Sequence, residues 1–279
     1  MFNGDRKALA RGSLFEFDES RIKISECEDF RTVFGFFETA RSEEEKEFPL
    51  AYGMLIHDNF IQLTLLLSAI YQPQNQFCLA VDGNSTKEFV EQVALLASCY
   101  PNIHYFITDK IKWCGYEILT SVFQCVDYLS RLPSDWKYFQ YLSGVDAPLK
   151  SNLEMVRIFK AFNGSFNAEI SPFEYYRLNR KLKVLSQIEF LRGTTCADES
   201  LWATIAGNPD KLAMPGGFNA AKWLRKHRGA NSDYYVSRYQ QYVNRPPAKC
   251  QGMEGFRKTG ITGEPLEIER SVREQNCSA

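Results

Sequence analysis

The sequence lacks the glycine-rich motifs with which many α/β proteins hold phosphates. No G-x-G-x-x-G follows the first apolar run, and no Walker A motif occurs in the 279 residues. These absences argue against dinucleotide-binding and P-loop folds. A nucleotide-sugar enzyme stays compatible with the sequence, because its sheet can hold the base and ribose without a glycine-rich loop.

An excess of either charge is also lacking. The chain has 33 Lys and Arg residues against 34 Asp and Glu, for a formal net charge of -1 at pH 7. A dedicated binder of nucleic acids or membrane surfaces would show a basic surplus, so we expect no nucleic-acid partner. Hydrophobic residues make up 44% of the chain, enough to bury the core of one large α/β domain or two small ones.

Long apolar runs are missing as well. Residues 1–12 are polar and charged, unlike a signal peptide, and the apolar stretch at 61–70 is too short to span a bilayer. If the protein enters the secretory pathway, we expect its membrane anchor to be absent from this chain.

The eight cysteines include no C-x-x-C pair, which argues against a structural zinc site. Two explanations stay open for them: buried free thiols in a cytosolic enzyme, or disulfides in a secretory protein. The N-x-S/T triplets at Asn84 and Asn163 permit glycosylation, although such triplets are common by chance.

Apolar runs alternate with helical periodicity through the first half of the chain. Buried strands are predicted at 50–57, 77–82, 103–108 and 138–144. Helices are predicted at 59–71, 87–99, 115–132 and 153–162. This alternation is typical of a mostly parallel sheet covered by helices, in which we expect the first two strands to be adjacent and parallel. A further short helix at 199–205 would have Asp198 as its N-cap.

Polar residues stand where the first two predicted strands end. His57 and Asp82 hold these positions, and ligands of open parallel sheets bind beyond the carboxyl ends of the strands. We therefore predict a binding site that includes both side chains. The alternative is that Asp82, Gly83 and Asn84 form only a polar turn.

Four blocks of the sequence stand out by their length and order. They are FPLAYGMLIH at 48–57, AIYQPQNQFCLAVD at 69–82, YFQYLSGVDAPLKSNLE at 138–154 and CADESLWATI at 196–205. These blocks resemble glycosyltransferase family 14, the core-2/I-branching β-1,6-N-acetylglucosaminyltransferases, and the similarity runs from Cys27 to Asn208 with a fainter trace to Cys250. The resemblance implies a GT-A-like three-layer α/β/α fold with a mostly parallel central sheet.

The resemblance also implies a reaction. An inverting glycosyltransferase of O-glycan branching would move N-acetylglucosamine from UDP-N-acetylglucosamine to the 6-hydroxyl of an acceptor sugar. Its partners would be the UDP-sugar donor and a glycan or glycoprotein acceptor, in the Golgi lumen or, for the full-length form, at the Golgi membrane. Family members resemble metal-independent enzymes, and no D-x-D motif occurs at Asp82 or Asp146, so we expect neither a metal nor a cofactor.

Roles of individual residues follow from the same resemblance. The residues matched to uridine binding are Leu55, His57 and Asp82, and those matched to acceptor binding are Glu169, Arg177 and Tyr239. Glu199 matches the catalytic base, and we expect partial burial beside Leu201 and Trp202 to make its carboxylate basic enough for this role. The alternative is an ordinary first-turn glutamate facing the helix dipole.

Two disulfides are implied in the same way, Cys27–Cys99 and Cys78–Cys125. Each would tie a strand or the N-terminal segment to a helix, for roughly 3–4 kcal/mol if unstrained. Cys114 and Cys196 are expected to be free thiols.

The sequence departs from the family at two places. Between Lys181 and Val184 the family has several tens of extra residues, and after Cys250 its basic pyrophosphate-binding residues have no match, so neither Arg257 nor Lys258 receives that role. These gaps predict weak transfer activity or none. Three alternatives to an active β-1,6-N-acetylglucosaminyltransferase stay open: an impaired isoform that keeps only UDP-sugar binding, a xylosyltransferase-like enzyme, and a cytosolic α/β enzyme with free thiols.

The expected domain organisation follows these matches. Residues 1–47 would form an irregular, stem-like segment, and residues 48–250 the glycosyltransferase domain, incomplete near 182–184. Residues 251–279 would form a divergent, disordered tail. None of these features selects a particular acceptor glycan.

Overall fold

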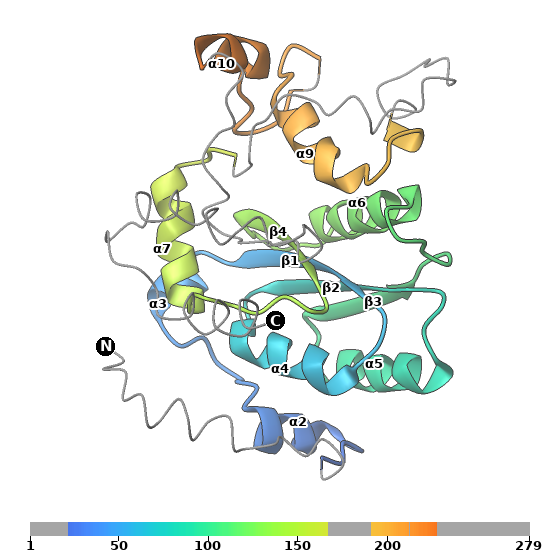
Figure 1. Ribbon diagram of the computed structural model, residues 1–279. Coiled ribbons are helices and arrows are strands. Elements are labelled where there is room, and N and C mark those ends of the chain that lie inside the picture. Colours follow the sequence, from blue (N-terminus) through green and yellow to red (C-terminus); the bar gives the residue numbers. More distant parts are fainter. Residues whose placement is uncertain (1–21, 167–190, 212, 228–279) are drawn as a thin grey trace, which may run out of the picture. The chain divides into compact units, whose positions relative to one another are not determined.

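The computed structural model describes residues 22–166, 191–211 and 213–227 (Figure 1). The described residues form two compact units. One holds the residues up to Gly164 and those from 191 to Trp202, and the other holds Ser165, Phe166 and the residues from Ala203 onward. The central sheet belongs to the first unit.

Four strands form one parallel sheet. They are β1 (Leu50–Ile56), β2 (Gln76–Val81), β3 (Ile103–Ile107) and β4 (Tyr138–Ser143), in the order β3-β2-β1-β4. Every neighbouring pair is parallel, with Tyr52 of β1 opposite both Phe77 and Gln140. The predicted α/β class and the adjacent, parallel first two strands are therefore confirmed.

Helices connect the strands and cover both faces of the sheet. They are α4 (Phe60–Ile70), α5 (Lys87–Cys99) and α6 (Tyr116–Ser130). Helices α4 and α5 lie on one face and α6 on the other, so the sheet is the middle of three layers (Figure 1). Parallel strands need crossovers of this kind, because the chain must return to the same end of the sheet before each new strand begins.

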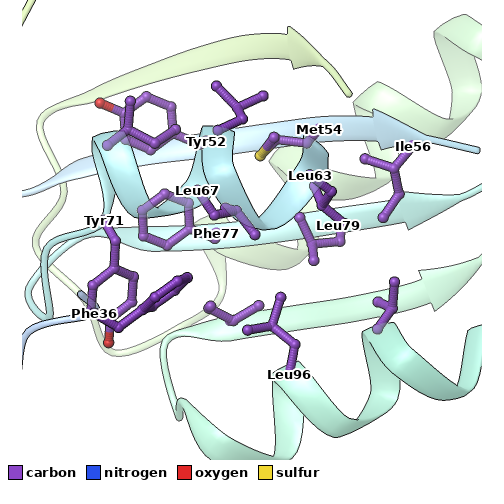
Figure 2. Close-up of a cluster of buried hydrophobic side chains, with 14 of the residues drawn as sticks. Phe36, Tyr52, Met54, Ile56, Leu63, Leu67, Tyr71, Phe77, Leu79 and Leu96 are labelled. Carbon is purple, nitrogen blue, oxygen red and sulfur yellow. The ribbon is translucent and has the colours of Figure 1, made fainter. Parts of the chain in front are cut away.

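Alternating side chains build a separate core on each face. The core on the α4 and α5 face contains large residues, among them Tyr52, Met54, Phe77, Leu79, Leu63, Leu67 and Leu96 (Figure 2). The core on the α6 face contains Ala51, Cys78, Ala80, Cys125 and Leu129. Because successive residues of a strand point to opposite faces, a strand covered on both sides must be apolar at nearly every position, as β1 and β2 are.

Part of the N-terminal segment packs on this sheet. The irregular structure expected for residues 1–47 is wrong for α2 (Cys27–Phe34) and α3 (Glu43–Lys46). Phe30 and Phe34 of α2 are buried in the same core as β1 and β2. A helix this short is stabilised mainly by packing, which the charged local sequence does not reveal.

The remaining described helices are α7 (Asn152–Phe162), α9 (Asp198–Ala206) and α10 (Ala220–Lys226). Helices α7 and α9 occupy the predicted positions, except that Asp198 lies in the first turn of α9 rather than before it. None of the helices in the described parts of the chain is long and apolar enough to cross a membrane.

Candidate functional site

Asp82 lies where β2 ends and is nearly buried, with an exposed fraction of 7%. Its Oδ1 atom accepts hydrogen bonds from the Asn84 peptide N–H (2.8 Å), the Asn84 side-chain amide (3.1 Å) and the Ile111 peptide N–H (3.1 Å). These donors stabilise a carboxylate that has little access to water. Asp82 therefore joins its own turn to the loop that follows β3.

The turn after Asp82 requires a glycine. A Cβ atom at Gly83 would lie 2.6 Å from the carbonyl oxygen of Thr108 and 3.0 Å from the nitrogen of Lys110. Both atoms belong to the backbone, so neither can move aside as a flexible side chain would. The polar turn that the sequence analysis gave as the alternative is therefore present, and its hydrogen bonds use Oδ1 of Asp82. Within the described residues, all three hydrogen-bond donors of this carboxylate bind Oδ1 and none binds Oδ2.

His57 follows β1 and is fixed through its backbone. Its carbonyl accepts a 2.7 Å hydrogen bond from the hydroxyl of Ser85, which belongs to the Asp82 turn, whereas its side chain is 55% exposed. Leu55 is half-buried in β1 and lies opposite Ala80 of β2. The ends of β1 and β2 thus place Leu55, His57 and Asp82 at the same edge of the sheet.

The end of β4 extends this edge by a turn that the sequence analysis did not select. The peptide N–H of Gly144 donates to the carbonyl of Leu55 (2.9 Å), and Asp146 closes the turn by accepting from the peptide N–H of Ser143 (2.7 Å). Val145, in the middle of the turn, is 72% exposed. The available signal was Asp146, a polar residue two positions after the predicted strand at 138–144.

Trp113, in the loop after β3, was also missed. Its side chain is 89% exposed, which is uncommon for an aromatic residue of this size. It stands two residues after Ile111, whose N–H binds Asp82. An exposed indole beside a polar strand end offers a face on which a sugar or base can pack.

Cys114 and Cys196 form a disulfide, so the expectation of two free thiols is wrong. Their Cα atoms lie 4.0 Å apart, and the Cys196 peptide N–H donates to the Cys114 carbonyl (3.2 Å). The two residues are 82 positions apart, so only the tertiary fold brings them together. The two disulfides implied by the resemblance are also present, Cys27–Cys99 and Cys78–Cys125.

Glu199 lies in the first turn of α9 and is exposed, so the expected partial burial of its carboxylate is not found. Its peptide N–H donates to the Cys196 carbonyl (3.1 Å). Leu201 is 4% exposed. Residues two positions apart on a helix point about 200° apart, so the burial of Leu201 turns Glu199 toward solvent.

The predicted acceptor residues lie outside the described residues: Glu169, Arg177 and Tyr239. The two places of departure from the family, 181–184 and the residues after 250, also lie outside them. Within residues 22–166, 191–211 and 213–227, no cluster of three or more His, Cys, Asp and Glu side chains is arranged to hold a metal ion.

The chain is an α/β protein with a buried carboxylate and an exposed imidazole at the ends of parallel strands, which makes the carboxyl edge of its sheet the candidate ligand site. After β1, where dinucleotide-binding folds have a glycine-rich loop, this chain has His57, Asp58 and Asn59. Comparison with known families narrows this class, because residues 50–227 match the family described as "Branch: Core-2/I-Branching enzyme". The chain belongs to the core-2/I-branching enzyme family.

The chain is also similar in sequence to several named proteins. One is the beta-1,3-galactosyl-O-glycosyl-glycoprotein beta-1,6-N-acetylglucosaminyltransferase 3 of Rattus norvegicus, 32% identical over 188 residues, which cover 62% of this chain and 43% of the relative. The Homo sapiens protein of the same name is 38% identical over 152 residues, covering 53% and 34%. The Ovis aries protein is 32% identical over 274 residues, covering 76% and 61%. The chain thus spans less than two thirds of each relative's length.

The Ovis aries match also differs in length between the two proteins. The alignment spans 274 positions, but only 76% of the 279 residues of this chain take part in it. The relative therefore has residues within the matched stretch that lack a counterpart here. The sequence analysis expects such a shortfall between Lys181 and Val184, outside the described residues.

Proposed function

We propose that this chain forms the donor-binding part of an inverting β-1,6-N-acetylglucosaminyltransferase, with Glu199 as the general base. One observation carries the proposal. The loop after β3 binds Asp82 through the Ile111 N–H and is joined to the start of α9 by the Cys114–Cys196 disulfide. The proposed donor-binding edge and the Glu199 carboxylate therefore belong to one compact unit. Family membership and the names of the relatives support this reaction.

The donor would be UDP-N-acetylglucosamine, bound at the ends of β1 and β2. Oδ2 of Asp82 would accept a hydrogen bond from uracil or ribose, while the His57 ring and the Leu55 side chain complete the cradle. Three N–H groups already hold the Asp82 carboxylate in place. Binding would therefore cost little ordering of this side chain.

In the proposed reaction Glu199 takes the proton of the acceptor 6-hydroxyl. The hydroxyl oxygen forms a bond to the anomeric carbon from the face opposite UDP, and the bond between that carbon and the β-phosphate oxygen breaks. UDP leaves with the electron pair, so the configuration at the anomeric carbon is inverted. Glu199 is exposed, and an acceptor sugar packed over it would exclude water from its carboxylate.

The acceptor would be a glycan or glycoprotein, bound by Glu169, Arg177 and Tyr239. In a chain that carries the family's basic pyrophosphate-binding residues, those residues rather than a metal ion would neutralise the departing UDP, so the reaction would need no cofactor. The β-1,3-galactosyl-O-glycosyl-glycoproteins in the relatives' names are the first acceptors to test.

The location we propose is the Golgi lumen or, for the full-length form, the Golgi membrane. Three disulfides among the described residues support an oxidising compartment. They also argue against the cytosolic alternative, which required free thiols at these six cysteines.

A second candidate function is UDP-sugar binding with little or no transfer. The exposed Glu199 and the residues of the Ovis aries relative that lack a counterpart here favour it. On this account the 279-residue chain binds UDP, but it does not release UDP from the sugar donor when the acceptor is added.

A transfer assay with UDP-N-acetylglucosamine and galactosyl-β-1,3-N-acetylgalactosamine separates these candidates. We expect weak transfer or none by the 279-residue chain, and clear transfer by a version that carries the family's segments between Lys181 and Val184 and after Cys250. In that version Glu199→Gln should lower kcat by about 10²–10⁴-fold. Glu91→Gln, which changes an exposed glutamate of α5, is the matched control.

Undiminished transfer by Glu199→Gln would contradict its role as the base. Robust metal-free transfer by the 279-residue chain would contradict the second candidate. The absence of UDP binding by both versions would contradict both candidates.

A further inference from the structure

A continuous series of contacts runs from Asp82 to Glu199 through the Cys114–Cys196 disulfide. The Ile111 N–H binds Oδ1 of Asp82 (3.1 Å), and Cys114 follows Ile111 by three residues in the same loop. A disulfide bonds Cys114 to Cys196, and the Cys114 carbonyl accepts a hydrogen bond from the Cys196 peptide N–H (3.2 Å). The Cys196 carbonyl in turn accepts the N–H of Glu199 (3.1 Å).

The backbone at this disulfide is held in an uncommon conformation. Cys114 has a φ of 57° and Cys196 a φ of 52°, both in the left-handed region that L-residues with a side chain seldom occupy. Such conformations persist only where surrounding contacts impose them. Here the crosslink and the Cys196–Cys114 hydrogen bond are those contacts.

The other two disulfides of the described residues have different surroundings. Cys27–Cys99 joins the first residue of α2 to the last residue of α5, and Cys78–Cys125 joins β2 to α6 inside the core. Within the described residues, Cys114–Cys196 alone crosslinks the loop that binds Asp82 to the segment that begins α9.

We propose that the Cys114–Cys196 disulfide is a positioning device, which holds the first turn of α9 with Glu199 in a fixed place relative to the Asp82 edge. The proposal rests on the proposed function for the roles of Asp82 and Glu199. A base displaced by about 1 Å from its substrate can cost on the order of 10²-fold in rate, whereas donor binding at Asp82 does not depend on Glu199.

The test compares two double variants of the 279-residue chain and of the version with the family's segments. C114S/C196S removes the proposed device, and C27S/C99S removes a disulfide that does not contact the loop after β3. Hydrogen–deuterium exchange is measured on peptides that cover 109–116 and 197–206, UDP affinity by calorimetry, and kcat and KM by transfer. Non-reducing peptide mapping establishes the pairing first.

We expect C114S/C196S to raise exchange at 197–206 by about tenfold or more, because that turn loses its crosslink, and C27S/C99S to leave it unchanged. The UDP dissociation constant should change by less than about threefold in either variant. In the version that transfers, C114S/C196S should lower kcat by about 10–100-fold with little change in KM, a split that a purely stabilising disulfide would not produce.

Free thiols at Cys114 and Cys196 in the native chain would overturn the proposal, and so would equal exchange at 197–206 in both variants or an undiminished kcat in C114S/C196S. If no version transfers sugar, the proposed function fails, while the exchange comparison still decides the role of the disulfide. Should C114S/C196S fail to fold, mild reduction and alkylation of the folded C27S/C99S variant provides the same comparison, because Cys78 and Cys125 are fully buried.

Discussion

The peptide N–H of Ile111 lies 3.1 Å from Oδ1 of Asp82, although 29 residues separate them. Asp82→Ala removes the acceptor of this bond and of the two bonds from Asn84, leaving donors unpaired at a nearly buried site. We expect the free energy of unfolding to fall by about 2–3 kcal/mol, measured by urea denaturation.

Asp82→Asn is the matched variant, because its amide oxygen can take the place of Oδ1. It should lose less than about 1 kcal/mol. Asp135→Asn, which changes an exposed carboxylate before β4, is the control for charge. Equal stabilities for Asp82→Ala and Asp82→Asn would show that the three hydrogen bonds do not hold the turn.

Gly83 and Gly144 each follow a strand but differ in the space around them. A Cβ at Gly83 would lie 2.6 Å from the backbone oxygen of Thr108, whereas one at Gly144 would lie 3.4 Å from the nearest side-chain atom of Ile56. Gly83→Ala should therefore cost about 1–3 kcal/mol of unfolding free energy, and Gly144→Ala less than about 1 kcal/mol. Thermal unfolding of the two variants checks this order, and a reversed order would contradict the packing described for the turn.

Burial makes His104 a source of pH dependence. Its Nε2 lies 3.2 Å from Gln76 Oε1 and its Nδ1 lies 3.2 Å from the Tyr128 hydroxyl. Partial removal from water lowers the pKa of His104, because the charged ring loses hydration. The unfolded chain therefore takes up a proton at higher pH than the folded chain. The stability due to His104 should be complete above about pH 6.5 and be lost as the pH falls through the lowered pKa.

His104→Gln should accordingly flatten the dependence of the unfolding free energy on pH between about pH 7 and about pH 5. Urea denaturation at several pH values measures it. His57→Gln, at a histidine whose side chain is more than half exposed, is the control. Parallel pH curves for the native chain and His104→Gln would rule out this contribution.

The Cys27–Cys99 disulfide closes a loop with a sequence separation of 72 residues and ties α2 to α5. Because it restricts the unfolded chain, C27S/C99S should lose roughly 3–4 kcal/mol of unfolding free energy. A loss below about 1 kcal/mol in urea denaturation would mean that the N-terminal segment is held by packing around Phe30 instead.

The parts of the fold that the sequence predicted are those with a local signal. Strands β1 and β2 are buried on both faces, so their apolar runs are continuous, and α5 has the predicted bounds of 87–99 because its period and its cap at Thr86 are both local. Helix α2 escaped prediction, since Phe30 becomes a core residue only when the segment packs on the sheet.

In the candidate site, too, features with a local signal were predicted and features that depend on tertiary contacts were not. The positions of Asp82 and His57 at strand ends were predicted because a polar residue after a buried run is visible in the sequence; their roles in binding stay predictions. The Cys114–Cys196 pair was not, since its contact joins segments 82 residues apart. The exposure of Glu199 was not predicted either, because it depends on which side of α9 packs inward. That side contains Leu201, and Glu199 is exposed.

Calorimetric titration of UDP into the native chain and Asp82→Asn tests the central claim most directly. The substitution keeps an oxygen for the Ile111 and Asn84 donors but replaces the free Oδ2 acceptor with a donor. We predict that the native chain binds UDP and that Asp82→Asn binds it at least about tenfold more weakly, the loss of one hydrogen bond to a charged group, while remaining folded. An unchanged UDP affinity in folded Asp82→Asn would contradict the assignment of this strand edge as the donor site.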